Sequence, residues 1–104
     1  MSDKKPRPRT GRRQDERAAR ELVRQRQKLA LLEPGGSRER PIIVPTSPVI
    51  EVRVESLPCP LCAGHFHIDD HQAPTAVLRE VSVTCQRCGV RRSLWFRIGT
   101  ALAN

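Results

Sequence analysis

The residues best suited to chemistry in this sequence are its four cysteines, which occur as two Cys-x-x-Cys pairs. The pairs are Cys59-Pro-Leu-Cys62 and Cys85-Gln-Arg-Cys88, with residues 63–84 between them. A tetrahedral metal ion needs four ligands, and each Cys-x-x-Cys turn directs two sulfur atoms toward one point. The long insert lets a hairpin bring the two pairs together. The spacing therefore predicts one four-cysteine zinc site.

Two other uses of the same cysteines stay open. Two disulfides would need an oxidising compartment, and the basic N-terminus is followed by no apolar region of the kind found in secretory signals. Iron is held by the same ligand set in rubredoxin-like sites, but those proteins are usually acidic and aromatic-rich. This chain has a net charge of +8, two Phe, one Trp and no Tyr. We therefore expect one Zn²⁺ in a reducing, cytoplasmic protein that has no membrane-spanning segment.

The predicted site offers no position for a reacting molecule. Four protein ligands complete a tetrahedral coordination sphere, whereas metal-assisted hydrolysis needs an open position. No pattern elsewhere in the sequence places a nucleophile beside a general base. We therefore expect the zinc ion to be structural and the protein not to be an enzyme.

The two cysteine turns and the segments around them resemble the zinc-ribbon group over residues 49–98. Gly89 directly follows the last cysteine, where the ribbon pattern wants a residue that tolerates positive φ, so that backbone N–H groups can point at the thiolates. Pro60 also fits, because it pre-sets φ in the first turn. The first turn departs from the pattern, since Ala63 stands where glycine is usual and Gly64 follows it. The resemblance implies a structural zinc ion but no particular activity, because ribbons serve many purposes.

Short strands would position these turns. Ile50, Val52 and Val54 alternate with charged residues, which predicts a half-buried strand leading into the first turn. Asp69–Pro74 has the composition of a turn. The predicted fold class is small α+β, a zinc ribbon of short antiparallel strands preceded by a basic helix and a disordered N-terminal tail. The predicted strands are residues 50–55, 65–68, 77–84 and 92–98.

The positive charge of the chain is concentrated ahead of the predicted ribbon. Residues 1–40 contain thirteen Lys/Arg and six Asp/Glu, a difference of +7, whereas residues 41–104 contain six and five, a difference of +1. A stretch without Gly or Pro before Pro34-Gly35-Gly36 predicts a helix. Prolines 41, 45 and 48 exclude a central strand, although Ile42–Val44 can lie along a sheet edge. The expected organisation is a disordered basic tail (1–11), a basic helix (12–33), a Pro/Gly-rich linker (34–48), the zinc ribbon (49–98) and a tail (99–104).

The basic residues of the helix and of the second cysteine turn are candidates for contact with nucleic acid, because clustered arginines attract polyanions. Two other interpretations of the helix stay open: a solvated helix that merely carries charge, and an amphipathic helix that docks Leu22, Leu29 and Leu32 on a partner or a second copy. The arginines beside the cysteines could equally offset the charge of the thiolates. The candidates are Arg12, Arg13, Arg17, Arg20, Arg24, Arg26, Lys28, Arg87, Arg91 and Arg92.

The leading hypothesis from the sequence is a non-enzymatic zinc-ribbon protein that binds DNA or RNA, for example in transcription. The alternative is an adaptor whose ribbon docks on a larger assembly, such as one that processes nucleic acid. His65, His67 and Asp69 would share one face of a strand and could hold a second metal ion, although exposed strand residues are the simpler interpretation. Trp95 is predicted to pack on the sheet, with base stacking as its alternative.

Overall fold

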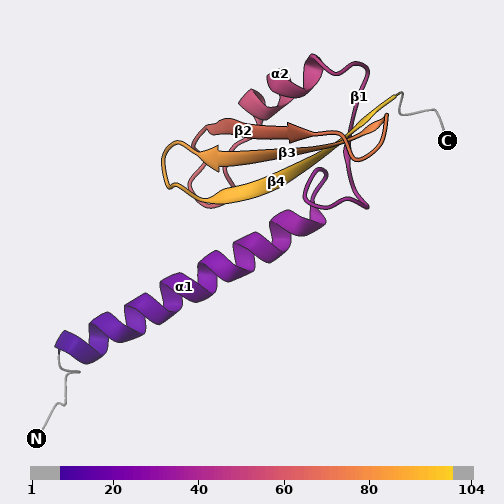
Figure 1. The fold of residues 1–104 in the computed structure, drawn as a ribbon. Coiled ribbons are helices and arrows are strands. Elements are labelled where there is room, and N and C mark those ends of the chain that lie inside the picture. Colours follow the sequence, from indigo (N-terminus) through magenta and orange to yellow (C-terminus); the bar gives the residue numbers. More distant parts are fainter. Residues whose placement is uncertain (1–7, 100–104) are drawn as a thin grey trace, which may run out of the picture.

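The computed structural model of the protein describes residues 8–99, and the side chains of residues 11–99. This part of the chain is a small α+β fold with two helices and one four-stranded mixed sheet (Figure 1). Residues 1–7 of the expected tail, and residues 100–104 of the expected C-terminal tail, lie outside the described residues. The elements are α1 (Pro8–Leu32), β1 (Ile42–Val44), α2 (Val49–Ser56), β2 (Phe66–Gln72), β3 (Leu78–Cys85) and β4 (Arg91–Ile98).

The sheet has the strand order β1-β4-β3-β2. Strands β2, β3 and β4 form an antiparallel meander, in which Phe66 lies opposite Cys85 and Val81 lies opposite Leu94. Strand β1 is added to the free edge of β4 in a parallel register that places Ile42 opposite Phe96. The antiparallel part agrees with the strands expected of a ribbon, whereas β1 and α2 are additions to it.

The core lies on one face of this sheet. Inward-facing residues alternate along β3 and β4 with half-buried or exposed ones, as a sheet with one covered face requires. Helix α2 supplies Ile50 and Val54, both fully buried, and packs beside β2. We call the sheet together with α2 the body. The buried core of the body is Ile42, Val44, Ile50, Val54, Cys59, Phe66, Val81, Val83, Cys85, Leu94 and Phe96.

The strand predicted at residues 50–55 is wrong, because this segment is helix α2. The apolar residues alternate as in a strand, but Ile50 and Val54 also stand four residues apart and so share one helix face. Val52 is 63% exposed, whereas Val54 is 0% exposed. Leu57 ends the helix in an extended conformation, as expected for a residue before proline. Burying Ile50 and Val54 against the face of the sheet therefore contributed more than the β propensity of the residues in this segment.

Two further segments differ from the prediction. Residues 69–72, expected in a turn, continue β2 through a bulge between Ile68 and Asp70, and the connection to β3 follows at residues 73–77. The expected linker contains β1, whose Ile42 and Val44 are buried in the core. Because prolines flank β1 on both sides, it occupies an edge of the sheet.

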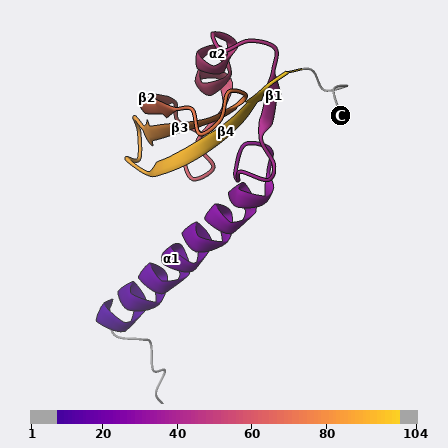
Figure 2. The same ribbon diagram turned by 45° about the vertical axis from the view of Figure 1, so that its right-hand side comes forward.

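Helix α1 projects away from the body and contacts it only near its C-terminal end (Figures 1 and 2). It begins at Pro8, earlier than expected, and ends at Leu32. Ala30 is buried there, and Gly35 carries the chain on with φ +85. A Cβ on Gly36 would collide with the carbonyl oxygen of Ala30, so the chain can fold back closely only with glycine at that position. Among residues 8–99, no helix is long and apolar enough to cross a membrane.

Candidate metal centre

The two cysteine pairs occupy turns at the same end of the sheet. The first turn follows α2 and leads into β2, and the second connects β3 to β4. We call residues 59–64 the first knuckle and residues 85–90 the second knuckle. The pairing of Phe66 with Cys85, and a hydrogen bond from the N–H of Gln86 to the carbonyl of His65 at 2.8 Å, hold the knuckles side by side.

The four sulfur atoms form a cluster with the dimensions of a metal site. All four lie within 4.8 Å of one another. The Sγ atoms of Cys59 and Cys88 are 3.7 Å apart, and those of Cys62 and Cys85 are 3.4 Å apart. A tetrahedron with metal–sulfur bonds of about 2.3 Å has sulfur–sulfur edges of about 3.8 Å, whereas a disulfide needs about 2.05 Å. The cysteines are free thiols that could hold a metal ion.

Backbone N–H groups point at the sulfurs from both knuckles. In the first knuckle, Leu61 donates to Cys59 Sγ and Gly64 donates to Cys62 Sγ, each at 3.4 Å. In the second, the N–H groups of Arg87 and Cys88 both donate to Cys85 Sγ at 3.4 Å. Such bonds favour the ionised form of a thiol, which is the form that binds metal.

Cys85 shows the electrostatic effect of these bonds. The N–H groups of Cys88 and Arg87, together with the hydrogen-bonded sulfurs of Cys62 and Cys88, outweigh burial and lower the Cys85 pKa to about 6. The direction is the one that a metal ligand needs, because a metal ion competes with protons for the thiolate.

The two knuckles are built alike despite their different sequences. Each is closed by an N–H to carbonyl bond over four residues, from Ala63 to Cys59 at 2.8 Å and from Gly89 to Cys85 at 3.0 Å. The residue after the second cysteine has positive φ in both, 62° at Ala63 and 78° at Gly89. The positive φ expected at Gly89 is therefore confirmed. In the first knuckle an alanine adopts the same conformation without the help of glycine.

Gly64 has a role at the site that its sequence position alone does not reveal. A Cβ on this residue would lie 2.7 Å from the Cβ of Arg87, 3.1 Å from Cys85 Sγ and 3.2 Å from Cys62 Sγ. Glycine is therefore required here for space, because the first knuckle passes directly over the sulfurs. In the sequence, the only sign of this role is that glycine follows Ala63 instead of standing directly after Cys62. The need for glycine at position 64 arises from the second knuckle, which the sequence alone does not place against it.

Three of the ten basic candidates are engaged at the knuckles. Arg26 reaches from α1 and donates to the carbonyl of Leu61 at 3.1 Å. Arg87 donates from the second knuckle to the carbonyl of Cys62 at 3.4 Å. Arg92 is half-buried beside the site, and that burial lowers its pKa. These contacts favour the interpretation in which these arginines support the cysteine site. Arg91, at the start of β4, is exposed.

Five other basic residues form one continuous stripe along α1. Their spacings of three and four residues place them on one helix face, and all are exposed. We call this set the basic stripe: Arg13, Arg17, Arg20, Arg24 and Lys28. Arg12 is also exposed but does not follow this spacing.

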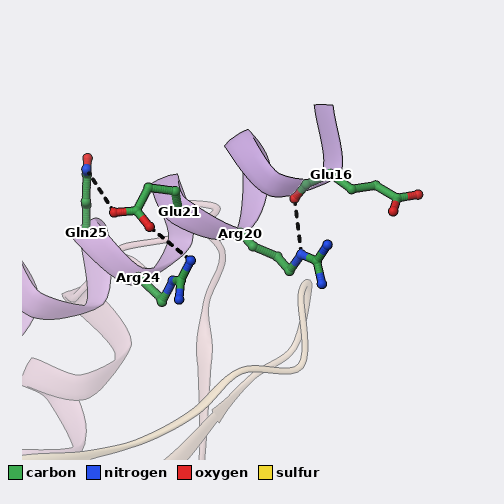
Figure 3. Close-up of polar contacts among 5 residues, drawn as sticks. All are labelled: Glu16, Arg20, Glu21, Arg24 and Gln25. Carbon is green, nitrogen blue, oxygen red and sulfur yellow. Dashed lines mark hydrogen bonds and ion pairs between the residues drawn. The ribbon is translucent and has the colours of Figure 1, made fainter. Parts of the chain in front are cut away.

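Figure 3 shows two members of the stripe with their partners. Arg24 forms an ion pair with Glu21 at 2.9 Å, and Arg20 donates to the backbone carbonyl of Glu16 at 3.3 Å rather than to its carboxylate. Gln25 also donates to Glu21, at 3.4 Å. Because Arg24 and Glu21 are 67% and 55% exposed, their ion pair contributes little and exchanges readily with other anions.

The histidine-rich strand does not assemble a second metal site. His67 Nε2 lies 4.0 Å from Asp69 Oδ1, while Asp69 accepts a hydrogen bond from the Thr84 hydroxyl. His65 precedes β2 and does not join His67 and Asp69 in a group with the spacing of metal ligands. Within residues 8–99, the four cysteines form the one group with the proximity of a metal-ligand set.

Comparisons with protein-family models, with curated proteins and with solved structures found no match to this chain.

Proposed function

We propose that this chain is a non-enzymatic zinc protein that binds nucleic acid through the basic stripe of α1. The observation that carries the proposal is the arrangement of charge. The stripe is continuous and exposed on a helix that projects from the body, while Arg26 and Ala30 lie on the helix face that meets the body. The stripe is thus presented to solvent rather than used to hold the fold together.

Zinc is the metal that best suits the cysteine cluster. Four thiolates are the ligands of structural zinc, and the sulfur–sulfur distances of 3.4 and 3.7 Å are close to a tetrahedral edge. The backbone N–H groups and Arg87 partly offset the formal charge of −2 on such a site. Four protein ligands leave no position for substrate, which supports a structural role and a protein without enzymatic activity.

Metal analysis tests this part of the proposal. Protein purified under reducing conditions should contain one zinc per chain, and a chelator should remove the metal together with the fold, because the binding free energy of a structural zinc is folding free energy. A red, iron-containing protein, or a metal-free protein with two disulfides, would contradict the assignment of zinc.

The stripe fits the backbone of a nucleic acid. Residues 13–28 of an α-helix span about 22 Å at 1.5 Å per residue, which is long enough to follow several phosphates of a duplex. Arginine and lysine side chains that neutralise phosphates release counterions, so affinity depends on salt. Contacts to phosphate carry no sequence information, and we therefore propose binding with little sequence preference to DNA or RNA.

A salt titration tests nucleic-acid binding. Zinc-loaded protein should bind random duplex and single-stranded oligonucleotides with a dissociation constant below about 100 µM at physiological salt. The logarithm of the affinity should fall with the logarithm of salt concentration by about 0.9 per phosphate neutralised on duplex DNA, so five contacts give a slope near −4.5. Absence of salt-sensitive binding would refute the proposal and leave the zinc assignment intact.

A protein-interaction adaptor is the second candidate function. Trp95 favours the adaptor. Leu94 and Phe96 point into the core from one face of the sheet, whereas Trp95 lies on the other face and is only half-buried. Aromatic residues are enriched in protein interfaces. Affinity capture with and without nuclease separates the two candidates: a protein partner retained after nuclease treatment favours the adaptor, and a partner lost with the nucleic acid favours the stripe.

A further inference from the structure

Strand β2 is a free edge of the sheet, and helix α2 lies next to that edge (Figure 1). In the sheet of residues 8–99, β2 is an outermost strand and pairs only with β3. We propose that an extended, basic segment of another protein binds between β2 and α2 and adds to the sheet as a further strand. An open groove of about 760 Å³ lies there. We call it the edge groove, and it is lined by Glu51, Val54, Glu55, His65, Phe66, His67, Ile68 and Gln86.

The backbone of β2 offers hydrogen-bonding groups to an added strand. The N–H of Gln86 donates to the carbonyl of His65, so these two residues form a pair whose backbone groups face each other. Backbone groups alternate in direction along an antiparallel strand, and those of Phe66 and Ile68 therefore point to the free edge. Within residues 8–99, neither residue has a backbone hydrogen bond outside the sheet. Such unpaired N–H and C=O groups are the ones that strand addition uses.

The bulge of β2 limits the length of this edge. It lies between Ile68 and Asp70 and interrupts the register, which leaves Phe66 to Ile68 as the regular part of the edge. At about 3.4 Å per residue, this stretch is roughly 10 Å long and pairs with about three residues of an added strand. The edge groove therefore suits a short extended segment rather than a long strand.

The α2 side of the edge groove is acidic, although the chain as a whole carries a net charge of +8. Glu51 and Glu55 are both exposed there, and the ion pairs among the described residues are formed elsewhere. Arg53, also on α2, does not line the groove. Charge complementarity therefore favours a segment with Lys or Arg, and the same carboxylates repel the phosphates of a nucleic acid.

Basic side chains at every second position of the segment fit this lining. Alternate residues of a strand share one face and are about 6.7 Å apart, while Glu51 and Glu55 are separated by about 6 Å along α2. The apolar lining of the groove is Val54, Phe66 and Ile68. The aliphatic stems of Lys or Arg can pack on these residues while the charged ends reach the carboxylates.

A second copy of this chain does not have the charges that the edge groove requires. Two antiparallel β2 strands joined at this edge would place both α2 helices on the same face of the enlarged sheet. Glu51 and Glu55 of the two copies would then approach one another, which like charges oppose. The side chains that β2 directs to that face are Phe66 and Ile68, which are apolar. The basic stripe lies on a helix and is not available as a strand.

A peptide titration followed by NMR tests the proposal. The probe is the blocked peptide acetyl-Thr-Arg-Thr-Arg-Thr-amide, added to zinc-loaded, full-length protein without nucleic acid. The backbone N–H signals of Phe66 and Ile68 should shift downfield as hydrogen bonds form, with a dissociation constant of about 0.1–1 mM, since so short a segment binds weakly. The control peptide, with glutamate in place of both arginines, should cause no such shift.

Two double variants test the acidic side of the groove. Glu51→Gln with Glu55→Gln should weaken binding of the arginine peptide about tenfold. The matched control is Glu16→Gln with Glu39→Gln, which replaces two exposed glutamates that do not line the edge groove. Both double variants raise the net charge equally, from +8 to +10. Only the groove variant should bind the peptide more weakly.

Backbone methylation of the peptide tests strand addition. One peptide carries N-methyl groups on both arginine nitrogens, and a second carries them on the nitrogens of the threonines that follow the arginines. Alternate N–H groups of a strand point in opposite directions, so only one of the two sets faces β2. One peptide should therefore lose binding by at least about tenfold, and the other should bind like the parent peptide.

Four results would overturn the proposal. Absence of downfield shifts at Phe66 and Ile68 with about 5 mM peptide would exclude binding at the edge. Equal effects of the two double variants, or equal binding of the two methylated peptides, would exclude the acidic contact or the added strand. Shifts that appear with protein concentration alone would assign the edge to a second copy. Because nucleic acid is absent throughout, failure here is distinct from failure of nucleic-acid binding.

Discussion

Ala63 and Gly89 occupy equivalent positions in the two knuckles and share a left-handed backbone conformation, with φ of 62° and 78°. Each follows the second cysteine of its pair, and the N–H of each donates to the carbonyl of the first cysteine. The conformation is required by the turn around the metal site rather than by the residue. An alanine held there is strained, since left-handed backbone costs about 1–2 kcal/mol for residues other than glycine.

This equivalence predicts opposite effects of exchanging the two residue types. Ala63→Gly should raise the unfolding free energy by about 0.5 kcal/mol, because relief of backbone strain exceeds the added entropy of the unfolded chain. Gly89→Ala should lower it by about 1 kcal/mol through backbone strain alone, since its Cβ would have nothing within 4 Å. Urea denaturation of the zinc-loaded proteins measures both changes, and stabilisation by Gly89→Ala would contradict the argument.

Gly64→Ala should damage the metal site directly. The added methyl group would sit 3.1 Å and 3.2 Å from the sulfurs of Cys85 and Cys62 and 2.7 Å from the Cβ of Arg87. The knuckles must move apart, at a cost of about 1–3 kcal/mol. Competition with a chelating dye should show weaker zinc binding. Gly89→Ala serves as the control, because it strains the backbone without crowding the sulfurs.

Metal retention should depend on pH in the direction that the Cys85 pKa dictates. Its folded value of about 6 is below the ordinary value of 9.0, so the stability that its thiolate contributes is complete above about pH 9 and is lost as pH falls through about 6. Because protons compete with zinc for the thiolates, zinc release followed by a chromogenic chelator should rise as the pH falls. Release that is complete already at neutral pH would be inconsistent with this stabilised thiolate.

The basic stripe should dominate the salt dependence of nucleic-acid binding. Replacing Arg17, Arg20 and Arg24 by glutamine should reduce the magnitude of the salt slope by about 2.7, at about 0.9 per phosphate contact.

The matched control replaces three exposed arginines outside the stripe by glutamine: Arg38, Arg53 and Arg97. Both triple variants lower the net charge equally, from +8 to +5. Only the stripe variant should show the reduced salt slope. Equal losses would mean that net charge, and not the stripe, drives binding.

Two valine substitutions distinguish helix α2 from the strand that was predicted for the same residues. In a strand, Val52 and Val54 would face the same side and truncation would have similar effects. In the helix, Val54→Ala should cost about 2 kcal/mol, because it removes buried methyl groups, whereas Val52→Ala should change stability by less than about 0.5 kcal/mol. Chemical denaturation of the zinc-loaded variants supplies both values.

The four-cysteine cluster was predictable from the sequence because each of its two pairs is local. A Cys-x-x-Cys turn brings its own two sulfurs together, and the positive φ at Gly89 follows from the same turn. Helix α1 was similarly accessible, since a long stretch without Gly or Pro has few other regular conformations. The four-cysteine cluster in the structure agrees with the predicted ligand set.

Tertiary structure decided the features that depend on distant residues. The segment from Val49 to Ser56 has an alternating pattern suited to a strand, but it forms a helix that buries apolar residues against one face of the sheet. The edge of β4, where a further strand could pair, is occupied by β1. The arginines look alike in the sequence, yet Arg26 and Arg87 bind knuckle carbonyls while the stripe faces solvent. Gly64 became essential only because the opposite knuckle lies against it. Spacing along the chain therefore determined which cysteines cluster. Packing between distant segments determined which arginines contact the knuckles and which remain exposed to solvent.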